Sequence, residues 1–179
     1  MSVPETAKDG IKFTGIASRE ELAACPGITT GERFEKGPVA VIECVQEIPC
    51  NPCEHACSSG AIVVGQPITR LPVLDGAKCI GCGACLAFCP GLAIFLVHKN
   101  YTDTSSLVEF PYEYLPLPAE GSLVPCGGRD GDFIAEGKVV KVKQTRQNDG
   151  TALIVVEIPK EYFMDIRTIC RKETYHGQG

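Results

Sequence analysis

The sequence contains no tryptophan, and aromatic residues make up only 7% of its 179 residues. It has no excess of basic residues, and its net charge of −5 argues against nucleic acid as the main partner. It has no run of 18 apolar residues, so we expect no membrane span. It also lacks a Walker A sequence and a G-x-G-x-x-G motif after a strand, and its three histidines are scattered. We therefore expect no nucleotide-binding or catalytic machinery within this chain.

The composition that remains is that of a folded protein with many loops. Hydrophobic residues account for 44% and charged residues for 22%, and there are 13 prolines and 19 glycines. The first ten residues contain no apolar segment of the kind found in secretory signals, so we expect a cytoplasmic location. A disulfide framework is not expected in such a chain, because disulfide-dense domains are small and secreted.

Cysteine is the abundant exception, with 11 residues in the chain. Four of them form the run Cys79-Ile-Gly-Cys82-Gly-Ala-Cys85-Leu-Ala-Phe-Cys89-Pro90. This is the C-x2-C-x2-C-x3-C-P run of bacterial iron–sulfur proteins, in which the fourth cysteine ligates the other cluster of a two-cluster protein. The run therefore demands a second set of cysteines.

The spacing within the run has a physical cause. Three thiolates two residues apart can wrap one side of a cubane only if the backbone turns tightly. Gly81 and Gly83 permit that turn and let amide N–H groups approach the sulfides.

An altered second set lies upstream, at Cys44, Cys50, Cys53 and Cys57. It keeps the x2 and x3 spacings, but its first gap is x5. The sequence that follows it, Ser-Ser-Gly-Ala-Ile-Val, parallels Pro-Gly-Leu-Ala-Ile-Phe after the downstream run. This internal repeat predicts, in each half, a short strand, a ligand loop with one helical turn, and a return strand, over residues 39–97.

The segment Leu-Asp-Gly-Ala-Lys-Cys-Ile-Gly-Cys-Gly at residues 74–83 closely resembles the approach to the second motif in two-[4Fe-4S] bacterial-type ferredoxins. The resemblance covers roughly a third of the chain and implies an α+β fold with a pseudo-twofold dicluster core. By the crossed ligation of that family, one [4Fe-4S] cluster would be held by Cys57, Cys79, Cys82 and Cys85. The other would be held by Cys44, Cys50, Cys53 and Cys89.

The upstream set, Cys44, Cys50, Cys53 and Cys57, departs from the family pattern at two places. Three extra residues, including Pro49, separate Cys44 from Cys50, and Ser58 stands where a proline is expected. These departures leave open whether Cys44 is a ligand and which cluster type this set binds.

Other interpretations remain open for some residues. Zinc also binds cysteines at x2 spacing, but its sites usually use two separated pairs. His55 could replace a cysteine ligand, although a solvated loop histidine is the simpler interpretation. Cys25, Cys126 and Cys170 are expected to be small buried hydrophobic residues.

We divide the chain into four segments. Residues 1–38 form an N-terminal extension with a short helix that begins at the capping box Ser18-Arg-Glu-Glu21. Residues 39–100 form the dicluster ferredoxin-like domain, and residues 101–130 a proline-rich linker. Residues 131–179 form a C-terminal β-hairpin and helix.

The pattern predicts the details of the last segment. Val140 and Val142 share one face of its first strand, and Asn148-Asp-Gly150 makes a tight turn. Residues 151–158 return as the second strand, and a helix follows Pro159 with Tyr162, Ile166, Ile169 and Cys170 buried at helical spacing.

Two adjacent clusters pass single electrons, so we interpret the chain as an electron-transfer protein, not as an enzyme in its own right. Its layout resembles the ferredoxin-type subunits of FAD-containing amine or imino-acid dehydrogenases of the proline or hydroxyproline type. That resemblance implies an iron–sulfur subunit in a hetero-oligomer, relaying electrons to or from FAD or FMN in a partner subunit.

The partner would then dock on the stretch around Tyr112 and Tyr114 and on the C-terminal segment. In the alternative interpretations, the Tyr112 stretch is a surface linker and the C-terminal segment completes the chain's own fold. The alternatives are a freestanding soluble ferredoxin and a non-redox, metal-stabilised interaction protein.

Overall fold

The structure is a computed structural model that describes residues 9–144 and 150–171. The elements of the N-terminal part are α1 (Ile11–Thr14), α2 (Arg19–Ala24), α3 (Gly31–Phe34), β1 (Val39–Ile42), α4 (Pro52–Ala56), β2 (Ile62–Val63), β3 (Val73–Leu74), α5 (Ala84–Ala87) and β4 (Ile94–His98). Those of the C-terminal part are β5 (Ser105–Tyr112), β6 (Leu123–Gly127), β7 (Phe133–Lys143), β8 (Ala152–Pro159), the 3-10 turn η2 (Lys160–Tyr162) and β9 (Thr168–Ile169). Helices and strands are mixed, so the predicted α+β class is confirmed.

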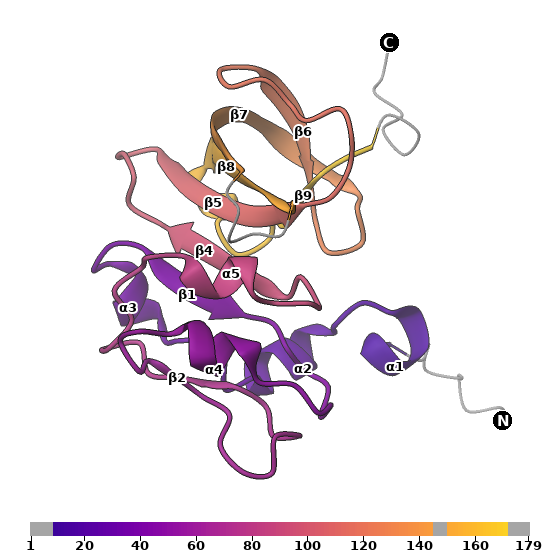
Figure 1. Ribbon diagram of the computed structural model, residues 1–179. Coiled ribbons are helices and arrows are strands. Elements are labelled where there is room, and N and C mark those ends of the chain that lie inside the picture. Colours follow the sequence, from indigo (N-terminus) through magenta and orange to yellow (C-terminus); the bar gives the residue numbers. More distant parts are fainter. Residues whose placement is uncertain (1–8, 145–149, 172–179) are drawn as a thin grey trace, which may run out of the picture.

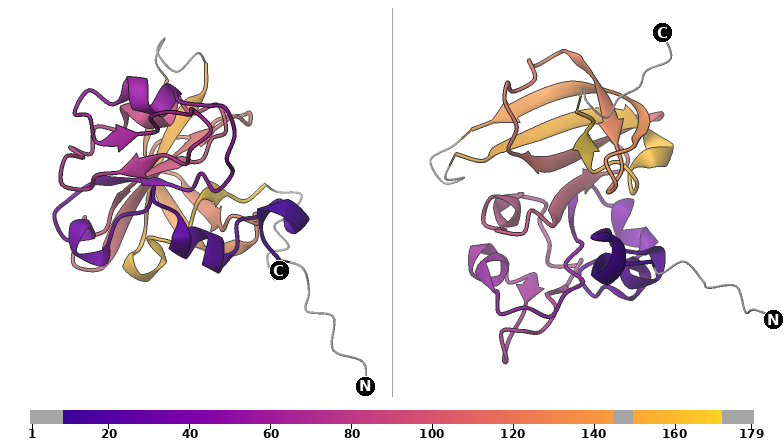
Figure 2. Two further views of the ribbon diagram at one scale, coloured as in Figure 1. Left: turned by 90° about the horizontal axis from the view of Figure 1, so that it is seen from below. Right: turned by 90° about the vertical axis from the view of Figure 1, so that its right-hand side faces the viewer.

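A seven-stranded antiparallel sheet in the order β1-β4-β5-β8-β7-β6-β9 runs through both parts. Figure 1 shows its strands β5 to β9 curling into an upper half, while β1 and β4 lie in a lower half with the helices. The two further views show the same stacking of the halves (Figure 2). β8 pairs with both β5 and β7, so the C-terminal segment supplies central strands of the sheet.

The lower half follows the internal repeat. β1 pairs antiparallel with β4, and the two-residue strands β2 and β3 pair with each other. Each half of the repeat thus contributes one strand to each pair. The short strand predicted at the start of the repeat is confirmed as β1, and all four of its side chains are buried.

The capping box predicted for the N-terminal extension is also confirmed. The Ser18 hydroxyl accepts a hydrogen bond from the Glu21 N–H at 3.2 Å, and the Glu21 carboxylate accepts one from the Ser18 N–H at 2.8 Å. The same carboxylate accepts from the Ile11 N–H at 3.0 Å, which joins α1 to α2.

The segment expected as a proline-rich linker contains β5 and β6, so that expectation is corrected at residues 105–112 and 123–127. Ser106 and Phe110 of β5 are fully buried. Pro111 fits in this strand because β4 pairs with β5 only over residues 107–109, so Pro111 has a partner strand on one side alone.

The helix expected after Pro159 is wrong. The chain makes the 3-10 turn η2 and then β9, which pairs with β6 through Cys126 opposite Ile169. Ile166, Ile169 and Cys170 are buried as predicted, whereas Tyr162 is only half-buried. Strand pairing at the edge of the sheet has overridden the helical spacing of these apolar residues.

β7 and β8 pair as the predicted hairpin, but a β-bulge shifts the alternation of the β7 side chains by one residue. Val139 lies opposite Val156 and Lys141 opposite Val155, so Val140 is the extra residue of a β-bulge. Val139 is consequently buried and Val140 is exposed, which corrects the predicted apolar face. Residues 148 and 149 of the predicted tight turn lie outside the described residues.

Both halves share one continuous hydrophobic core, which extends from Phe34 to Ile169. The C-terminal segment therefore completes the chain's own fold, as the second interpretation of that segment expected. Within residues 9–144 and 150–171, no helix has the length and apolar character needed to cross a membrane.

Candidate metal centre

The cysteines of the downstream run lie around α5. Cys79 and Cys82 precede this helix, Cys85 lies in its first turn, and Cys89 follows its last residue by two positions. Cys82 is exposed, whereas Cys85 is 7% exposed. Gly81 and Gly83 have φ angles of +67° and +77°, so both adopt the left-handed conformation that their predicted role in the tight turn requires.

The upstream cysteines occupy corresponding positions around α4. Cys44 follows β1, Cys50 precedes α4, Cys53 lies within it and Cys57 caps its end. Cys53 is buried, and the other three are half-buried.

The thiol of Cys85 has neighbours from both motifs. Burial, together with the nearby thiols of Cys79, Cys82 and Cys57, raises the pKa of Cys85 to about 12. α4 also packs against α5, which brings Cys57 at the end of one helix towards Cys85 in the other. The structure thus gathers Cys57 with three cysteines of the other motif.

The remaining four cysteines gather in the same crossed manner. Burial and the thiol of Cys89 raise the pKa of Cys50, and the same two effects raise the pKa of Cys53 to about 11. Burial and Cys89 likewise raise the pKa of Cys44. All four thiols line one small hollow, whose walls include Ile42 and Ile94.

Backbone amides donate to two of the sulfurs at equivalent places of the repeat. The Ala61 N–H donates to Cys57 Sγ at 3.2 Å, and the Ala93 N–H donates to Cys89 Sγ at 3.4 Å. Burial acts to raise the pKa of Cys57, but hydrogen bonds from Ser59 and the amides at Ile62 and Ala61 lower it below its ordinary value. These donors favour a thiolate, the form that binds iron.

The donor set of each group, four thiols, fits a [4Fe-4S] cluster, which four cysteine thiolates hold. Four cysteines can also make a zinc site, whose ligands converge on one point at about 2.0–2.3 Å. In the described part of the chain, no three or more His, Cys, Asp or Glu side chains are placed to hold one metal ion. The metal content of the purified protein decides between the two.

A fifth cysteine supports the upstream set without belonging to it. The Cys25 thiol is buried and donates to the carbonyl oxygens of Ile42 at 3.2 Å and Cys44 at 3.5 Å. Cys126 and Cys170 are buried as predicted. His55 is exposed on α4, where its ring contacts the Asn51 amide at 3.2 Å, so it is a solvated histidine of a helix.

A buried ion network lies directly beside Cys44. Glu43 accepts hydrogen bonds from Arg129 Nε at 2.7 Å and from Arg167 Nε at 2.8 Å. Burial acts to raise the pKa of Glu43, but its bonds and charge interactions with the two arginines lower it below its usual range. The network joins the end of β1 to the C-terminal half.

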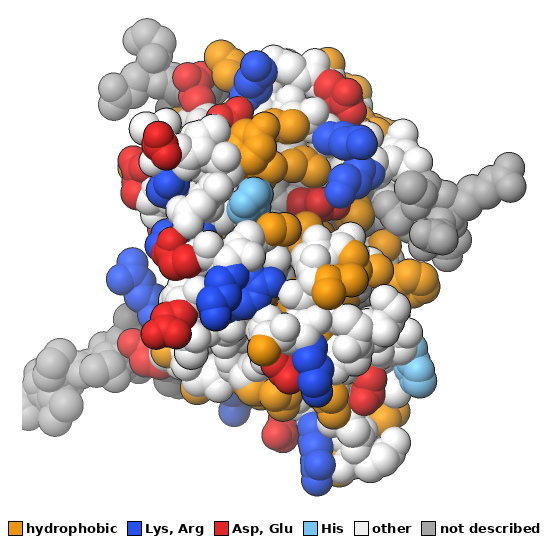
Figure 3. Space-filling view, turned by 90° about the vertical axis from the view of Figure 1, so that its left-hand side faces the viewer, with side chains coloured by type: hydrophobic (Ala, Val, Ile, Leu, Met, Phe, Trp, Pro, Cys, Tyr) orange, Lys and Arg blue, Asp and Glu red, His pale blue; other side chains and the backbone are white. Residues whose placement is uncertain are grey.

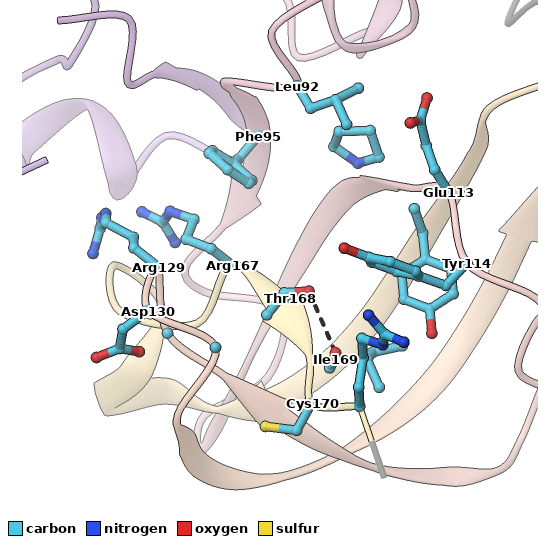
Figure 4. Close-up of a pocket in the computed structure, with 15 residues that line it drawn as sticks. Leu92, Phe95, Glu113, Tyr114, Arg129, Asp130, Arg167, Thr168, Ile169 and Cys170 are labelled. Carbon is cyan, nitrogen blue, oxygen red and sulfur yellow. Dashed lines mark hydrogen bonds between the residues drawn. The ribbon is translucent and has the colours of Figure 1, made fainter. Parts of the chain in front are cut away.

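A hollow of about 590 Å³ lies on the other side of these arginines. Figure 4 shows Leu92 and Phe95 on one wall and Glu113 and Tyr114 on another, with Arg167 beside Phe95. The Arg167 guanidinium lies 5.0 Å from the centre of the Phe95 ring. Leu92 is three residues from Cys89, so the hollow opens close to the thiols that gather around Cys89.

Sequence reasoning missed three supporting groups: Arg33, which donates a hydrogen bond to the Cys79 carbonyl, the Cys25 thiol and the Glu43 network. One signal was available, because Glu43 directly follows the apolar run of β1 and Arg167 follows the apolar Ile166. A charged residue in such surroundings indicates a buried ion pair.

Residues 72–95 match the family model described as the 4Fe-4S binding domain. The chain is 45% identical over 49 residues to one subunit of the ion-translocating oxidoreductase complex of Methanosarcina acetivorans. It is 46% identical over 48 residues to the aliphatic sulfonate oxidoreductase, polyferredoxin-like subunit, of Pyrococcus furiosus. The matched segment, which contains the downstream cysteine run, is a 4Fe-4S binding region of the ferredoxin type.

The two matches each cover 27% of this chain, and 17% and 27% of those proteins respectively. A third relative, Protein Pixie of Drosophila melanogaster, is 27% identical over 122 residues, which are 59% of this chain and 20% of Pixie. The chain therefore spans no more than about a quarter of these curated relatives. No solved structure matches it significantly.

Proposed function

We propose that this chain transfers electrons through two [4Fe-4S] clusters with crossed ligand sets. The first cluster would be held by Cys57, Cys79, Cys82 and Cys85, and the second cluster by Cys44, Cys50, Cys53 and Cys89. The observation that supports this most concerns the last cysteine of each motif. The Cys57 thiol lies near Cys85 of the other motif, and the Cys89 thiol lies near Cys50 and Cys53. Cys57 and Cys89 thus each lie near cysteines of the other motif.

A bound [4Fe-4S] cluster supplies reversible one-electron transfer at a potential set by its surroundings. The chain's own part is to hold and shield it. Buried Cys53 and Cys85 place one ligand of each set inside the core, and the amides of Ala61 and Ala93 stabilise two of the sulfurs. Exposed Cys82 marks the side on which the first cluster would lie nearest to solvent.

We further propose that the chain is an iron–sulfur subunit of a hetero-oligomeric oxidoreductase whose partner carries FAD or FMN. The names of two relatives, each a subunit of an oxidoreductase, support the subunit role. A docking surface is available at Tyr112, Tyr114 and Leu115, which we call the Tyr112 surface. Leu115 is 85% exposed there, and the hollow beside Leu92 adjoins it.

One other face of the molecule differs from this surface in character. On the face seen from the left of Figure 1, acidic and basic side chains are interspersed with small groups of hydrophobic ones (Figure 3). Interspersed charges of both signs favour neither nucleic acid nor a single-sign partner on that face.

Isolation of the native complex under anaerobic conditions tests the proposal. We expect a flavoprotein to co-purify with this chain, and the complex to lose its brown absorbance when the flavoprotein's substrate is added. A chain that elutes alone, carries clusters and reduces a general acceptor would instead establish a freestanding ferredoxin. A chain without redox-active iron would leave only the metal-stabilised interaction protein. The cytoplasmic location remains a prediction, which fractionation of the source cells tests.

A further inference from the structure

Arg33 in the N-terminal extension reaches into the lead-in of the downstream cysteine run. Its Nε donates to the Gly76 carbonyl at 2.7 Å, and its Nη1 to the Gly37 carbonyl at 3.1 Å. Its Nη2 donates to the carbonyls of Pro38 at 2.9 Å and Cys79 at 2.8 Å. One guanidinium thus fixes two stretches of chain that are about 40 residues apart in sequence, and one of them carries a thiol ligand.

The hydrogen bonds of Arg33 also support the ligand loop, through the carbonyl of Pro38. A Cβ on Gly81 would lie 2.5 Å from the Pro38 carbonyl oxygen, so the loop between Cys79 and Cys82 packs directly on that peptide group. Arg33 donates a hydrogen bond to the same carbonyl. The backbone of the loop therefore rests on a group whose position depends on Arg33.

The N-terminal extension also closes on the loop at Gly76. A Cβ there would lie 2.5 Å from Thr29 Oγ1 and 3.1 Å from the Arg33 side chain. Thr29 and Arg33 thus lie directly against the lead-in at Gly76, so this part of the extension belongs to the cluster site and not to a detached docking arm.

The charge of Arg33 is not balanced by a carboxylate. All four of its hydrogen-bond acceptors are backbone carbonyls, and none of the ion pairs among the described residues includes it. A half-buried cation fixed one peptide group from a thiolate favours the more negative, reduced state of whatever that thiolate binds.

We propose that Arg33 is the positioning residue for the cluster of Cys57, Cys79, Cys82 and Cys85, and that its fixed charge raises the reduction potential of that cluster. This inference rests on the proposed two-cluster function. It makes the two clusters unequal, since the other set has no arginine bonded to the carbonyl of one of its cysteines among the described residues.

The test uses the full chain, reconstituted anaerobically, in four forms: parent, Arg33→Gln, Arg33→Lys and Lys36→Gln. Lys36 is exposed and lines the same surface hollow as Arg33 and Cys79, so its neutralisation is the matched control for charge. Redox titration followed by electron paramagnetic resonance separates the two clusters, and a Cys50→Ser variant identifies the signal of the first. Iron content is measured on every form.

We expect Arg33→Gln to lower the potential of the first cluster and leave the second unchanged. Lys36→Gln should produce a clearly smaller shift, because solvent screens an exposed charge. Arg33→Lys should keep the potential close to that of the parent but lose iron from the first cluster faster on dilution, because an ammonium cannot bond four carbonyls at once.

Equal potentials in Arg33→Gln and parent, or equal shifts of both clusters, would overturn the assignment. If Arg33→Gln fails to hold the first cluster, the comparison of Arg33→Lys with Lys36→Gln decides: unchanged iron retention in the lysine variant would also overturn it. Failure of the proposed function is recognised separately, as a parent protein that shows fewer than two redox-active clusters.

Discussion

Glu43 and Arg167 form a buried ion pair, with 2.8 Å between Oε1 and Nε, that connects residues 124 positions apart. Their side chains are 6% and 2% exposed. Glu43 lies between the last residue of β1 and Cys44, whereas Arg167 directly precedes β9. The pair therefore ties one group of thiols to the far edge of the sheet.

Replacing Glu43 with Gln should lower the free energy of unfolding by about 3–5 kcal/mol, because it leaves buried Arg167 without its counter-ion. Glu35→Gln is the matched control, since the Glu35–Lys99 pair lies at the surface and such pairs contribute about 0–1 kcal/mol. Chemical denaturation followed by circular dichroism measures both. Equal losses in the two variants would show that the Glu43 network does not hold the halves together.

Exchange of single ligands tests the crossed arrangement. Cys57→Ala should damage the cluster that also uses Cys79, Cys82 and Cys85, although Cys57 belongs to the upstream motif. Cys89→Ala should damage the other cluster. Cys126→Ala is the control, because this buried cysteine lies on β6 outside both groups. Electron paramagnetic resonance of each reduced variant shows which cluster is lost, and damage confined to the motif of the mutated residue would refute crossed ligation.

Gly81→Ala should release iron from the first cluster. An alanine at φ +67° costs roughly 1–2 kcal/mol, and its Cβ would overlap the Pro38 carbonyl at 2.5 Å. Gly91→Ala is the matched control in the same motif, because an added Cβ there would meet nothing within 4 Å and its backbone is not left-handed. Iron retention after gel filtration compares the two. If both variants keep all of their iron, the close contact with Pro38 has no role in the site.

The Tyr112 surface should contribute to binding the flavoprotein. Tyr114→Ala and Leu115→Asp should each weaken the complex about tenfold or more, because truncating a central aromatic anchor costs about 2 kcal/mol. Leu123→Asp is the control, since Leu123 is also highly exposed, at 68%, but lies outside the hollows beside Tyr112. Titration of the purified subunits measures the affinities. Unchanged affinity in both Tyr112-surface variants would place the interface elsewhere.

The sequence predicted those features that depend on local spacing. The apolar run of β1, the capping box at Ser18 and the left-handed glycines of the cysteine loop each follow from a few neighbouring residues. Features that depend on distant partners were not predicted. β5 looked like part of a linker because its proline, Pro111, is compatible with a strand only where β4 has ended, and that end is not visible in the sequence.

The same reason explains the C-terminal error and the failure to predict the hydrogen bonds of Arg33. Ile166 and Ile169 have a helical spacing, but this part of the chain pairs with the free edge of β6 as strand β9. Arg33 bonds only to backbone carbonyls, which every residue carries, so no side-chain pattern marks its partners. The cysteine spacing, in contrast, marked eight candidate ligands, and their crossed grouping, which the ferredoxin resemblance implies, stays a prediction.

Iron and acid-labile sulfide, measured per chain on anaerobically purified protein, test the two-cluster account most directly. Two [4Fe-4S] clusters require about eight of each, with a broad brown absorbance that bleaches on reduction with dithionite. About four irons accompanied by one equivalent of zinc would contradict the account, because the upstream cysteines would then hold a structural ion and the chain could not relay electrons between two clusters.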